Sequence, residues 1–355
     1  MKIVHIVGNR PQFIKLDPLL KALKKHKRIK NIVVHTGQHY DFRMSQIFFK
    51  ELNIPEPDYN LEVGSGSHAL QTADAMMRLE PVLEKEKPDI VIVFGDTNTT
   101  LAGALTAVKM QIPTAHIEAG NRGVYLGFPE QINRLLVDHI SDFLFASSIF
   151  EKDNLLKEGI SEDKIFLVGN IMADALFDFK DNGFHKQLGL KNYAVLTLHR
   201  AETVDNKEKL KEVLDAVSYI SKKIPVVFPI HPRTKKMIDT FGLTNNLKTI
   251  EPVSYFEMLD LVKNSKMVLT DSGGLQAETT ILKIPCLTIR ETNEWPITTK
   301  EGTNLVVGTL QEKIIQEATN VLRGESEIFS RKTKIPEFWD GKTAERIINV
   351  LLKVL

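Results

Sequence analysis

Three carboxylates follow apolar segments in the first half of the chain, where they could carry protons to and from a substrate. Asp96 ends the run "DIVIVFGD", Glu118 ends "TAHIE", and Glu130 follows in "PEQINR". Asp96 alone could cap a helix, and Glu130 alone could favour a helix start. Like charges at one sheet edge repel each other and raise a carboxyl pKa, as acid–base chemistry requires. We therefore predict that these carboxylates transfer protons.

His199 is a fourth candidate for chemistry. It follows the apolar run "YAVLTL" and stands beside Arg200, although a lone histidine is usually structural. His231 repeats this pattern more weakly, in "PIHPRTKK". The ten histidines form no H-E-x-x-H motif and no cluster with cysteine, so metal catalysis is not expected.

The segment "LTDSGGLQAE" has the strand, small-residue turn and helix that hold phosphate groups. Ser272 is the predicted N-cap, and Gly273 and Gly274 let backbone N–H groups approach a phosphate closely. Glu278, one turn into the helix, could accept both hydroxyls of a ribose. Phosphate and ribose together indicate a nucleoside diphosphate. The alternative is a glycine-rich turn with a solvated glutamate.

Further cations and an aromatic ring complete the predicted substrate site. Arg10 and Lys15 flank a predicted helix start in "GNRPQFIK", where cations favour an anionic ligand, although each could instead form a surface ion pair. Arg122, which follows the turn after Glu118, is another predicted substrate contact. Phe256 in "EPVSYFEML" could support the nucleotide base, with core packing as the alternative.

The elements that position these residues alternate between strands and helices. Continuous apolar runs suit strands covered on both faces, and the segments between them carry apolar residues at helical spacing. This alternation predicts an α/β protein with two Rossmann-like, doubly wound domains facing a cleft, with ligands at the carboxyl ends of strands. Predicted strands cover residues 2–7, 31–37, 89–96, 114–120, 143–148, 165–170, 193–199, 225–231, 247–252, 267–272, 286–291 and 304–308.

Length and composition set the domain count and exclude some partners. The chain has 355 residues, more than one hydrophobic core usually organises, so two domains are expected. We place the N-terminal domain at 1–172, joined by a C-terminal helix at 341–355, and the second domain at 173–340.

The net charge of +1 provides no field that would attract nucleic acid or an anionic membrane. The single Cys286 and the lack of a long apolar stretch favour a soluble cytoplasmic protein.

In its motifs the chain resembles the non-hydrolysing UDP-N-acetylglucosamine 2-epimerases, which have the two-domain GT-B fold. The matching segments follow the family order over nearly the whole chain, and together they are a specific signal. They are "GNRPQFIKLDPL", "TGQHYD", "FGDTNTTLAGALTA", "HIEAGNR", "PEQINR", "DHISD", "VGN", "LHRAETVDN", "EPVSYFEML", "LTDSGGLQAE", "RETNEWP" and "EGTNLVVGT".

The resemblance implies a reversible isomerase that converts UDP-N-acetylglucosamine (UDP-GlcNAc) to UDP-N-acetylmannosamine (UDP-ManNAc) for polysaccharide or glycan biosynthesis. It also implies a homodimer that uses neither NAD nor another cofactor. The implied path eliminates UDP to give a 2-acetamidoglucal, then returns a proton and UDP. The implied catalytic positions are Asp96, Glu118, Glu130 and His199, and the implied UDP positions are Arg10, Lys15, Ser272, Gly273, Gly274 and Glu278.

The chain departs from the family pattern at several substrate positions. Gln131 follows Glu130 where a second glutamate is usual, and Trp295 stands where an arginine is often found. Met258 stands where a phenylalanine commonly packs on uracil, so Phe256 is expected to provide that packing. The segment "LEVGSGSHALQT" differs from the one that helps to bind an activating second UDP-GlcNAc in bacterial members.

Other activities remain open at the level of sequence. A hydrolysing relative would use the same residues but release ManNAc and UDP. A related epimerase would act on a deoxygenated UDP-hexosamine. A GT-B glycosyltransferase would need an acceptor site, for which we find no motif, and a non-catalytic UDP-sugar sensor would bind UDP without exchanging the C2 proton.

Overall fold

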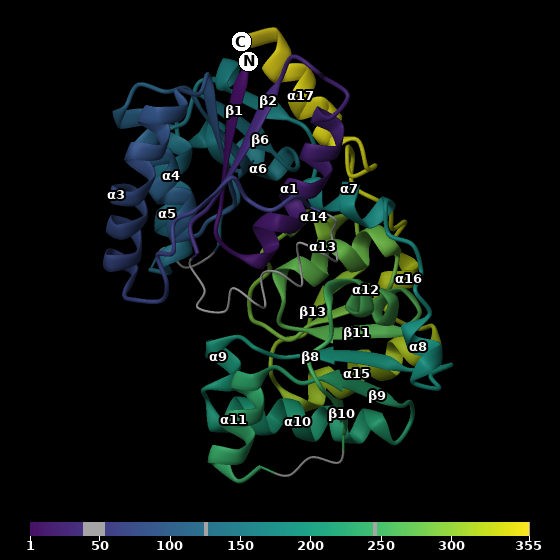
Figure 1. Ribbon diagram of the computed structural model, residues 1–355. Coiled ribbons are helices and arrows are strands. Elements are labelled where there is room, and N and C mark those ends of the chain that lie inside the picture. The colour runs from purple at the N-terminus through teal and green to yellow at the C-terminus, as the bar shows by residue number, and fades with distance from the viewer. Residues whose placement is uncertain (38–53, 124–126, 244–246, 355) are drawn as a thin grey trace. The chain divides into compact units, whose positions relative to one another are not determined.

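Two parallel sheets organise the chain, and each belongs to a separate unit (Figure 1). The computed structural model describes residues 1–37, 54–123, 127–243 and 247–354, so residues 38–41 of the motif "TGQHYD" lie outside the described part. Unit 1 comprises Met1–Asp178 and Glu337–Leu355, and unit 2 comprises Phe179–Pro336. The boundary placed at residue 172 from the sequence falls inside helix α7 (Ile171–Phe177), before the end of the first segment of unit 1.

Unit 1 contains, within the described residues, a seven-stranded parallel sheet in the order β3-β2-β1-β4-β5-β6-β7. The order reverses between β1 and β4, and doubly wound sheets bind ligands at such a switch point. Strand β3 was not predicted because a pair of residues gives no apolar run. The strands are β1 (Lys2–Val7), β2 (Lys30–His35), β3 (Tyr59–Asn60), β4 (Ile90–Phe94), β5 (Thr114–Ala119), β6 (Phe143–Ala146) and β7 (Ile165–Leu167).

Helices pack against this sheet in two groups. Every residue of β4 and β5 is buried, which explains their continuous apolar character. Helices α3, α4 and α5 pack side by side, and α1, α7 and α17 form the second group (Figure 1). The helices of unit 1 are α1 (Arg10–Leu23), α3 (His68–Glu86), α4 (Asn98–Lys109), α5 (Pro129–Ile140), α6 (Ile149–Lys157), the 3-10 turn η1 (Glu162–Lys164), α7 and α17 (Thr343–Val354).

The C-terminal segment is part of unit 1 although it follows unit 2 in the sequence. The indole N–H of Trp339, which is fully buried, donates a hydrogen bond of 2.9 Å to the backbone carbonyl of Ser147. The carboxylate of Asp174 accepts hydrogen bonds from the backbone N–H groups of Thr343 (3.0 Å) and Ala344 (2.8 Å). Asp174 therefore caps α17, whose buried face packs against α1 and α7.

Unit 2 has the same type of sheet. Its six described strands are all parallel, in the order β10-β9-β8-β11-β12-β13, so β8 and β11 meet at its switch point. The prediction of an α/β protein with two doubly wound parallel sheets is confirmed. The strands are β8 (Ala194–Thr197), β9 (Val226–Pro229), β10 (Lys248–Ile250), β11 (Met267–Thr270), β12 (Cys286–Thr288) and β13 (Asn304–Val306).

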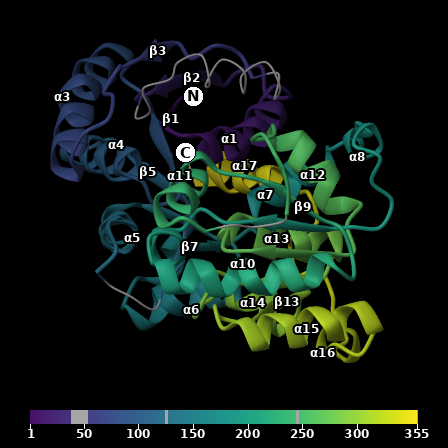
Figure 2. The same cartoon turned by 90° about the horizontal axis from the view of Figure 1, so that it is seen from below.

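Helices also flank the sheet of unit 2, and α10 and α15 lie side by side (Figure 2). Cys286, the only cysteine of the chain, is buried at the start of β12, and burial raises the pKa of its thiol to about 11. The helices are α8 (Phe184–Gln187), α9 (Ala201–Val204), α10 (Lys207–Ser221), α11 (Pro232–Phe241), α12 (Tyr255–Lys263), α13 (Gly273–Leu282), α14 (Pro296–Lys300), α15 (Gln311–Arg323) and α16 (Glu327–Ser330).

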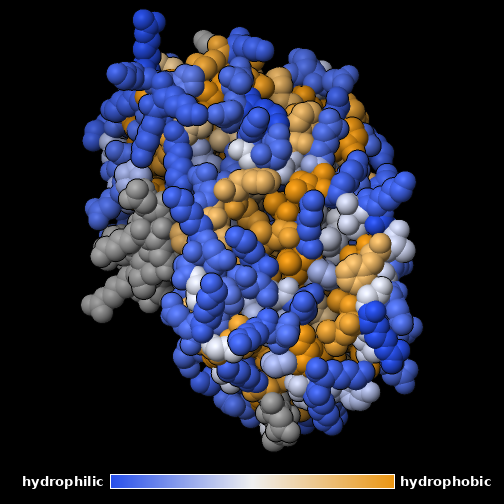
Figure 3. All heavy atoms as spheres, turned by 90° about the vertical axis from the view of Figure 1, so that its right-hand side faces the viewer, coloured by the Kyte–Doolittle hydropathy of each residue, from blue (hydrophilic) through white to orange (hydrophobic). Residues whose placement is uncertain are grey.

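Among the helices of the described residues, none combines the length and the apolar character needed to cross a membrane. The face drawn in Figure 3 carries hydrophilic side chains over much of its area, with smaller apolar areas between them.

Asp174→Ala should lower the stability of unit 1. The substitution removes the acceptor of two backbone N–H groups at the start of α17, so we expect a loss of about 2 kcal/mol in the free energy of unfolding. Urea denaturation followed by fluorescence measures this loss. The control is Asp178→Ala, because that carboxylate is 60% exposed and pairs only with Lys21 among the described contacts, so its loss should change stability by less than about 0.5 kcal/mol. Equal midpoints for the two variants would contradict the capping role.

Candidate active site

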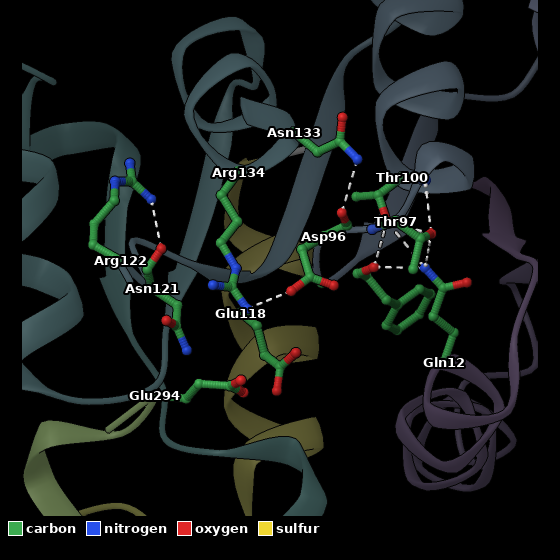
Figure 4. A network of polar contacts seen from close by, with 12 residues as sticks. Gln12, Asp96, Thr97, Thr100, Glu118, Asn121, Arg122, Asn133, Arg134 and Glu294 are labelled. Atoms are coloured by element: carbon green, nitrogen blue, oxygen red, sulfur yellow. Dashed lines mark hydrogen bonds and ion pairs between the residues drawn. The ribbon is translucent and has the colours of Figure 1, made fainter. Parts of the chain in front are cut away.

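One glutamine joins the ends of β1 and β4 at the switch point of unit 1. The side-chain oxygen of Gln12 accepts from the backbone N–H of Gly8 at 2.7 Å, and its amide donates to the carbonyl of Phe94 at 2.7 Å. The same amide donates to Thr100 Oγ1 at 3.0 Å (Figure 4). Gln12 also completes a capping box with Asn9 at the start of α1. The turns that carry the candidate residues after both strands are therefore held together.

Glu118 has an unusual backbone conformation near the end of β5. Its φ of 71° lies in the left-handed region, which residues other than glycine rarely adopt. The pairing of β5 with β6 shifts between Ile117 and Ala119, so Glu118 occupies a bulge. Its carboxylate forms an ion pair with Lys15 Nζ, and both residues are 9% exposed. Lys15, expected to contact UDP, thus lies against one of the candidate catalytic carboxylates.

Asp96 follows β4 and contacts helix α5. Its Oδ2 forms an ion pair with Arg134, and the side-chain amide of Asn133 donates to its backbone carbonyl at 2.9 Å (Figure 4). Asp96 is not the N-cap of α4, because Thr97 holds that position and accepts the capping hydrogen bond. The alternative that Asp96 serves as a helix cap is therefore excluded.

Each of the two acids at the ends of β4 and β5 forms an ion pair with a cation. Asp96 pairs with Arg134, and Glu118 pairs with Lys15. The expectation that like charges raise a carboxyl pKa at this edge stays a prediction. Each pair keeps a proton-accepting carboxylate in a fixed direction while a neighbouring cation balances its charge.

The other two candidates of unit 1 differ from each other. Glu130 is exposed in the first turn of α5, whose next turn supplies Arg134 to Asp96. Arg122 donates to both carboxylate oxygens of Glu158 at 2.7 Å and to Asp138 Oδ2 at 2.7 Å. These internal carboxylates engage the guanidinium, which argues against the predicted substrate contact of Arg122.

In unit 2, His199 follows β8 and is positioned by a buried aspartate. Its Nδ1 lies 3.0 Å from Asp271 Oδ1, while Asp271 Oδ2 accepts from the backbone N–H groups of His199 (2.7 Å) and Arg200 (2.8 Å). Burial alone would raise the pKa of Asp271, but His199 and the backbone N–H groups bring it below its usual value. The ring of His231 lies 5.9 Å from that of His199, which brings the two predicted histidines together.

The start of α13 has the features of an anion site. The helix begins at Gly273, and Ser272 occupies the N-cap position without making the usual side-chain capping hydrogen bond. A Cβ at Gly273 would collide with the carboxylate of Glu294, so a larger residue here would force the Glu294 side chain to move. Glu294 Oε1 in turn accepts from Arg200 at 2.7 Å and from Arg290 at 2.6 Å. Two arginines and a helix N-terminus thus lie around one internal carboxylate.

The remaining predicted ligand residues keep their expected elements. Glu278 lies on α13 and is 5% exposed, and a Cβ at Gly274 would meet no atom closer than 3.8 Å. Arg10 is the first residue of α1 in unit 1. Phe256 stacks on Phe179 with ring centroids 5.8 Å apart, so its role toward a nucleotide base stays a prediction.

The structure adds residues that were not assigned to the site from the sequence. Gln12 lies three residues after Asn9, the spacing of a capping box, so its helix-start role had a sequence signal. Asp271 directly precedes Ser272 in the motif that indicated phosphate binding. Arg134 and Glu294 had no comparable signal, because Arg134 lies 38 residues from Asp96 and Glu294 lies 94 residues from Arg200.

Comparison with known proteins identifies the family. The family model described as UDP-N-acetylglucosamine 2-epimerase matches residues 21–352. The chain is 46% identical over 368 residues to the UDP-N-acetylglucosamine 2-epimerase of Methanocaldococcus jannaschii, covering 99% of both chains. It is 43% identical to UDP-2,3-diacetamido-2,3-dideoxy-D-glucuronate 2-epimerase of Pseudomonas aeruginosa, covering 91% of this chain and 92% of that protein.

Solved structures agree with this result. The M. jannaschii enzyme, crystallised in complex with UDP-GlcNAc and UDP, superposes with a TM-score of 0.89 at 46% identity, covering 99% of this chain and all of that one. The Neisseria meningitidis UDP-GlcNAc 2-epimerase bound to UDP-GlcNAc gives a TM-score of 0.89 at 32% identity, with 99% of this chain and all of that chain covered. These similarities confirm the predicted GT-B fold class. The chain belongs to the UDP-N-acetylglucosamine 2-epimerase family.

Proposed function

We infer that this chain is a non-hydrolysing UDP-GlcNAc 2-epimerase, an isomerase that interconverts UDP-GlcNAc and UDP-ManNAc. The observation that carries this inference is family membership over nearly the whole chain, together with 46% identity to an epimerase solved with UDP-GlcNAc and UDP bound. The paired carboxylates at the ends of β4 and β5 are suited to its proton transfers. UDP-ManNAc would serve the synthesis of polysaccharides or other glycans.

The proposed reaction breaks and re-forms two bonds. A carboxylate removes the C2 proton, the C2–H electron pair forms the C1–C2 double bond, and the C1–O electron pair leaves with UDP. The resulting 2-acetamidoglucal is protonated at C2 from the opposite face while UDP returns to C1. Proton donors and acceptors on two faces of the sugar are therefore needed. We assign this work to Asp96, Glu118 and Glu130, without dividing the acid and base roles among them.

The second set of residues is proposed to bind UDP. The N–H groups at Ser272, Gly273 and Gly274 favour the diphosphate charge, with His199 and Arg10 as further donors. Glu278 is proposed to accept the ribose hydroxyls, and Phe256 to pack on the uracil. Lys15 is better suited to orienting Glu118 than to holding phosphate, because its ammonium group contacts that carboxylate.

A second candidate substrate comes from one relative. The P. aeruginosa protein named for UDP-2,3-diacetamido-2,3-dideoxy-D-glucuronate is 43% identical to this chain, close to the value for the M. jannaschii enzyme. The same elimination and re-addition would serve that substrate, since the change at C2 is identical. The two candidate substrates then differ in the substituents at C3 and C6 of the sugar.

We also propose a homodimer located in the cytoplasm. Helices α3 and α5 both pack on α4 and carry exposed apolar side chains. Ile132 and Leu136 are each 47% exposed, and their spacing places them on one face of α5. Leu70 and Met77 of α3 are 68% and 65% exposed. Such apolar surface is typical of a protein interface, and a second copy of this chain is the proposed occupant. The low cysteine content fits a reducing compartment.

Proton NMR in deuterated water tests the proposed activity. With UDP-GlcNAc alone we expect UDP-ManNAc to appear and deuterium to enter C2 of both sugars, because the intermediate is reprotonated from exchangeable groups. ManNAc and UDP accumulating without UDP-ManNAc would indicate a hydrolysing enzyme. Turnover only of the diacetamido-uronate substrate would favour the second candidate, and UDP binding without any exchange would indicate a sensor.

Asp96→Asn, Glu118→Gln and Glu130→Gln should each lower kcat by at least about 100-fold, because each removes a group proposed to carry a proton. UDP affinity, measured by calorimetry, should stay within about threefold. Glu208→Gln is a matched control, since Glu208 is also an exposed glutamate in the first turn of a helix. A variant that retains full turnover would remove its residue from the chemistry.

Met77→Glu combined with Ile132→Glu should shift the protein from dimer to monomer, because the interface would then bury unpaired charge. Light scattering after size-exclusion chromatography measures the mass. Leu310→Glu is the control, because Leu310 is 66% exposed at the start of α15 in unit 2 and should leave the mass unchanged. A monomeric wild-type protein would contradict the proposed dimer.

A further inference from the structure

Unit 1 contains a buried histidine–aspartate pair that contacts the turn before Asp96 and the bulge at Glu118. His116 lies on β5 and Asp138 on α5, and the two are 0% and 1% exposed. We propose that His116 and Asp138 form a charged positioning pair that holds the Gly95–Asp96 turn and the Glu118 bulge in the geometry needed for reaction. This inference rests on the proposed epimerase function, and neither residue is proposed to touch the substrate.

Hydrogen bonding indicates the charge of His116. Its Nδ1 lies 2.6 Å from Asp138 Oδ1, and its Nε2 lies 2.7 Å from the backbone carbonyl oxygen of Gly95. A carbonyl oxygen and an ionised carboxylate accept but do not donate. Both contacts are therefore hydrogen bonds only if both ring nitrogens carry protons, which makes the ring an imidazolium.

Asp138 is the ionised partner that this arrangement requires. Its Oδ2 accepts hydrogen bonds from the Arg122 guanidinium at 2.7 Å and from the backbone N–H of Gly120 at 3.0 Å, and both donors favour the ionised carboxylate. Burial raises the pKa of Asp138, whereas the contacts with His116 and Arg122 bring it below its usual value. Arg122 is itself paired with Glu158. The four charges thus form a chain of alternating sign, in which a protonated His116 and Arg122 lie on either side of Asp138 and Glu158 follows Arg122.

The Asp138 carboxylate connects the two sides of the Glu118 bulge. Oδ1 contacts the side chain of His116, two residues before Glu118. Oδ2 accepts from the backbone N–H of Gly120, two residues after Glu118, at 3.0 Å. A left-handed conformation at a residue other than glycine persists only where the surroundings enforce it. The two contacts of Asp138, a residue of α5, hold the bulge in this conformation.

His116 holds the neighbouring turn in the same way. The backbone N–H of Gly95 donates to the carbonyl of Ile117 at 3.0 Å, while the Gly95 carbonyl contacts the ring of His116. A Cβ at Gly95 would lie 3.2 Å from Lys15 Nζ and 3.4 Å from Glu118 Oε2. Gly95 thus lies directly against the Lys15–Glu118 ion pair and directly precedes Asp96. Movement of this turn would displace both candidate carboxylates.

Steady-state kinetics of His116→Gln test the positioning role. We expect kcat to fall by about 100-fold, because misplacement of catalytic groups by about 1 Å has effects of that size. KM and the UDP dissociation constant should change by less than about threefold, since substrate binding is not proposed to involve His116. A rise in KM with unchanged kcat would overturn the proposal.

His5→Gln is the matched control. His5 is also fully buried in the sheet of unit 1, on β1, where its Nε2 lies 3.0 Å from the Asn31 side chain, and burial lowers its pKa to about 4. The two variants should lose similar thermal stability, but His5→Gln should keep kcat within about threefold of wild type. Equal losses of kcat in both variants would show that His116 has only a structural role in the core, and would overturn the proposal.

Nitrogen-15 NMR of the histidine rings in the wild-type protein tests the charge without using activity. At pH 8 we expect two protonated ring nitrogens for His116 and one for His5, with assignment from the spectra of the two variants. If His116→Gln does not fold, Asp138→Asn provides the assignment and the kinetic test. A neutral His116 ring would overturn the charged pair even in an active enzyme. An inactive wild-type enzyme with a charged His116 would instead count against the proposed function alone.

Discussion

A buried charge needs a partner, and this constraint shapes the active edge of unit 1. Lys15 and Glu118 are 103 residues apart in the chain, yet their ion pair joins helix α1 to strand β5. Removing either group would leave the other group charged and without this partner at a site that is 9% exposed. The pair therefore fixes α1 against the sheet at the point where the candidate chemistry takes place. Gln12 connects β1 and β4 beside it through neutral hydrogen bonds.

Unit 2 satisfies the same constraint with different groups. One of its buried carboxylates, Asp271, is balanced by His199 and by two backbone N–H groups. Arg200 and Arg290 are balanced by Glu294 near the start of α13. The two units thus share a strand order but differ in what their strand ends offer. Unit 1 offers carboxylates held by cations, which suit proton transfer, and unit 2 offers cations and a helix N-terminus, which suit a departing diphosphate.

Local patterns allowed much of the fold to be predicted from the sequence. Continuous apolar runs indicated the strands of both sheets, and the small residues of "TDSGG" indicated the start of α13, because these signals lie within a few neighbouring residues. Strand β3 was not predicted, because Tyr59–Asn60 is too short to show an apolar run. The left-handed conformation of Glu118 had no signal either, since glycine is the residue that usually marks such a position.

Side-chain partners were the part of the site that could not be predicted. The sequence placed Asp96 and Glu118 at strand ends, but it could not show that Arg134 and Lys15 would pair with them. Arg122 illustrates the same limit, because its position after a strand suggested a ligand contact while Asp138 and Glu158 bind its guanidinium. A strand end indicates where a side chain lies, whereas its partner depends on helices that are distant in the sequence.

The burial of Cys286 gives the molecule an internal reporter. A thiol must lose its proton to be alkylated, and the pKa of about 11 keeps this thiol protonated at physiological pH while the fold covers it. Because the chain has no other cysteine, any labelling by a thiol reagent originates at the start of β12. The labelling rate therefore measures how often the sheet of unit 2 opens, and ligands that stabilise unit 2 slow it in proportion to their binding.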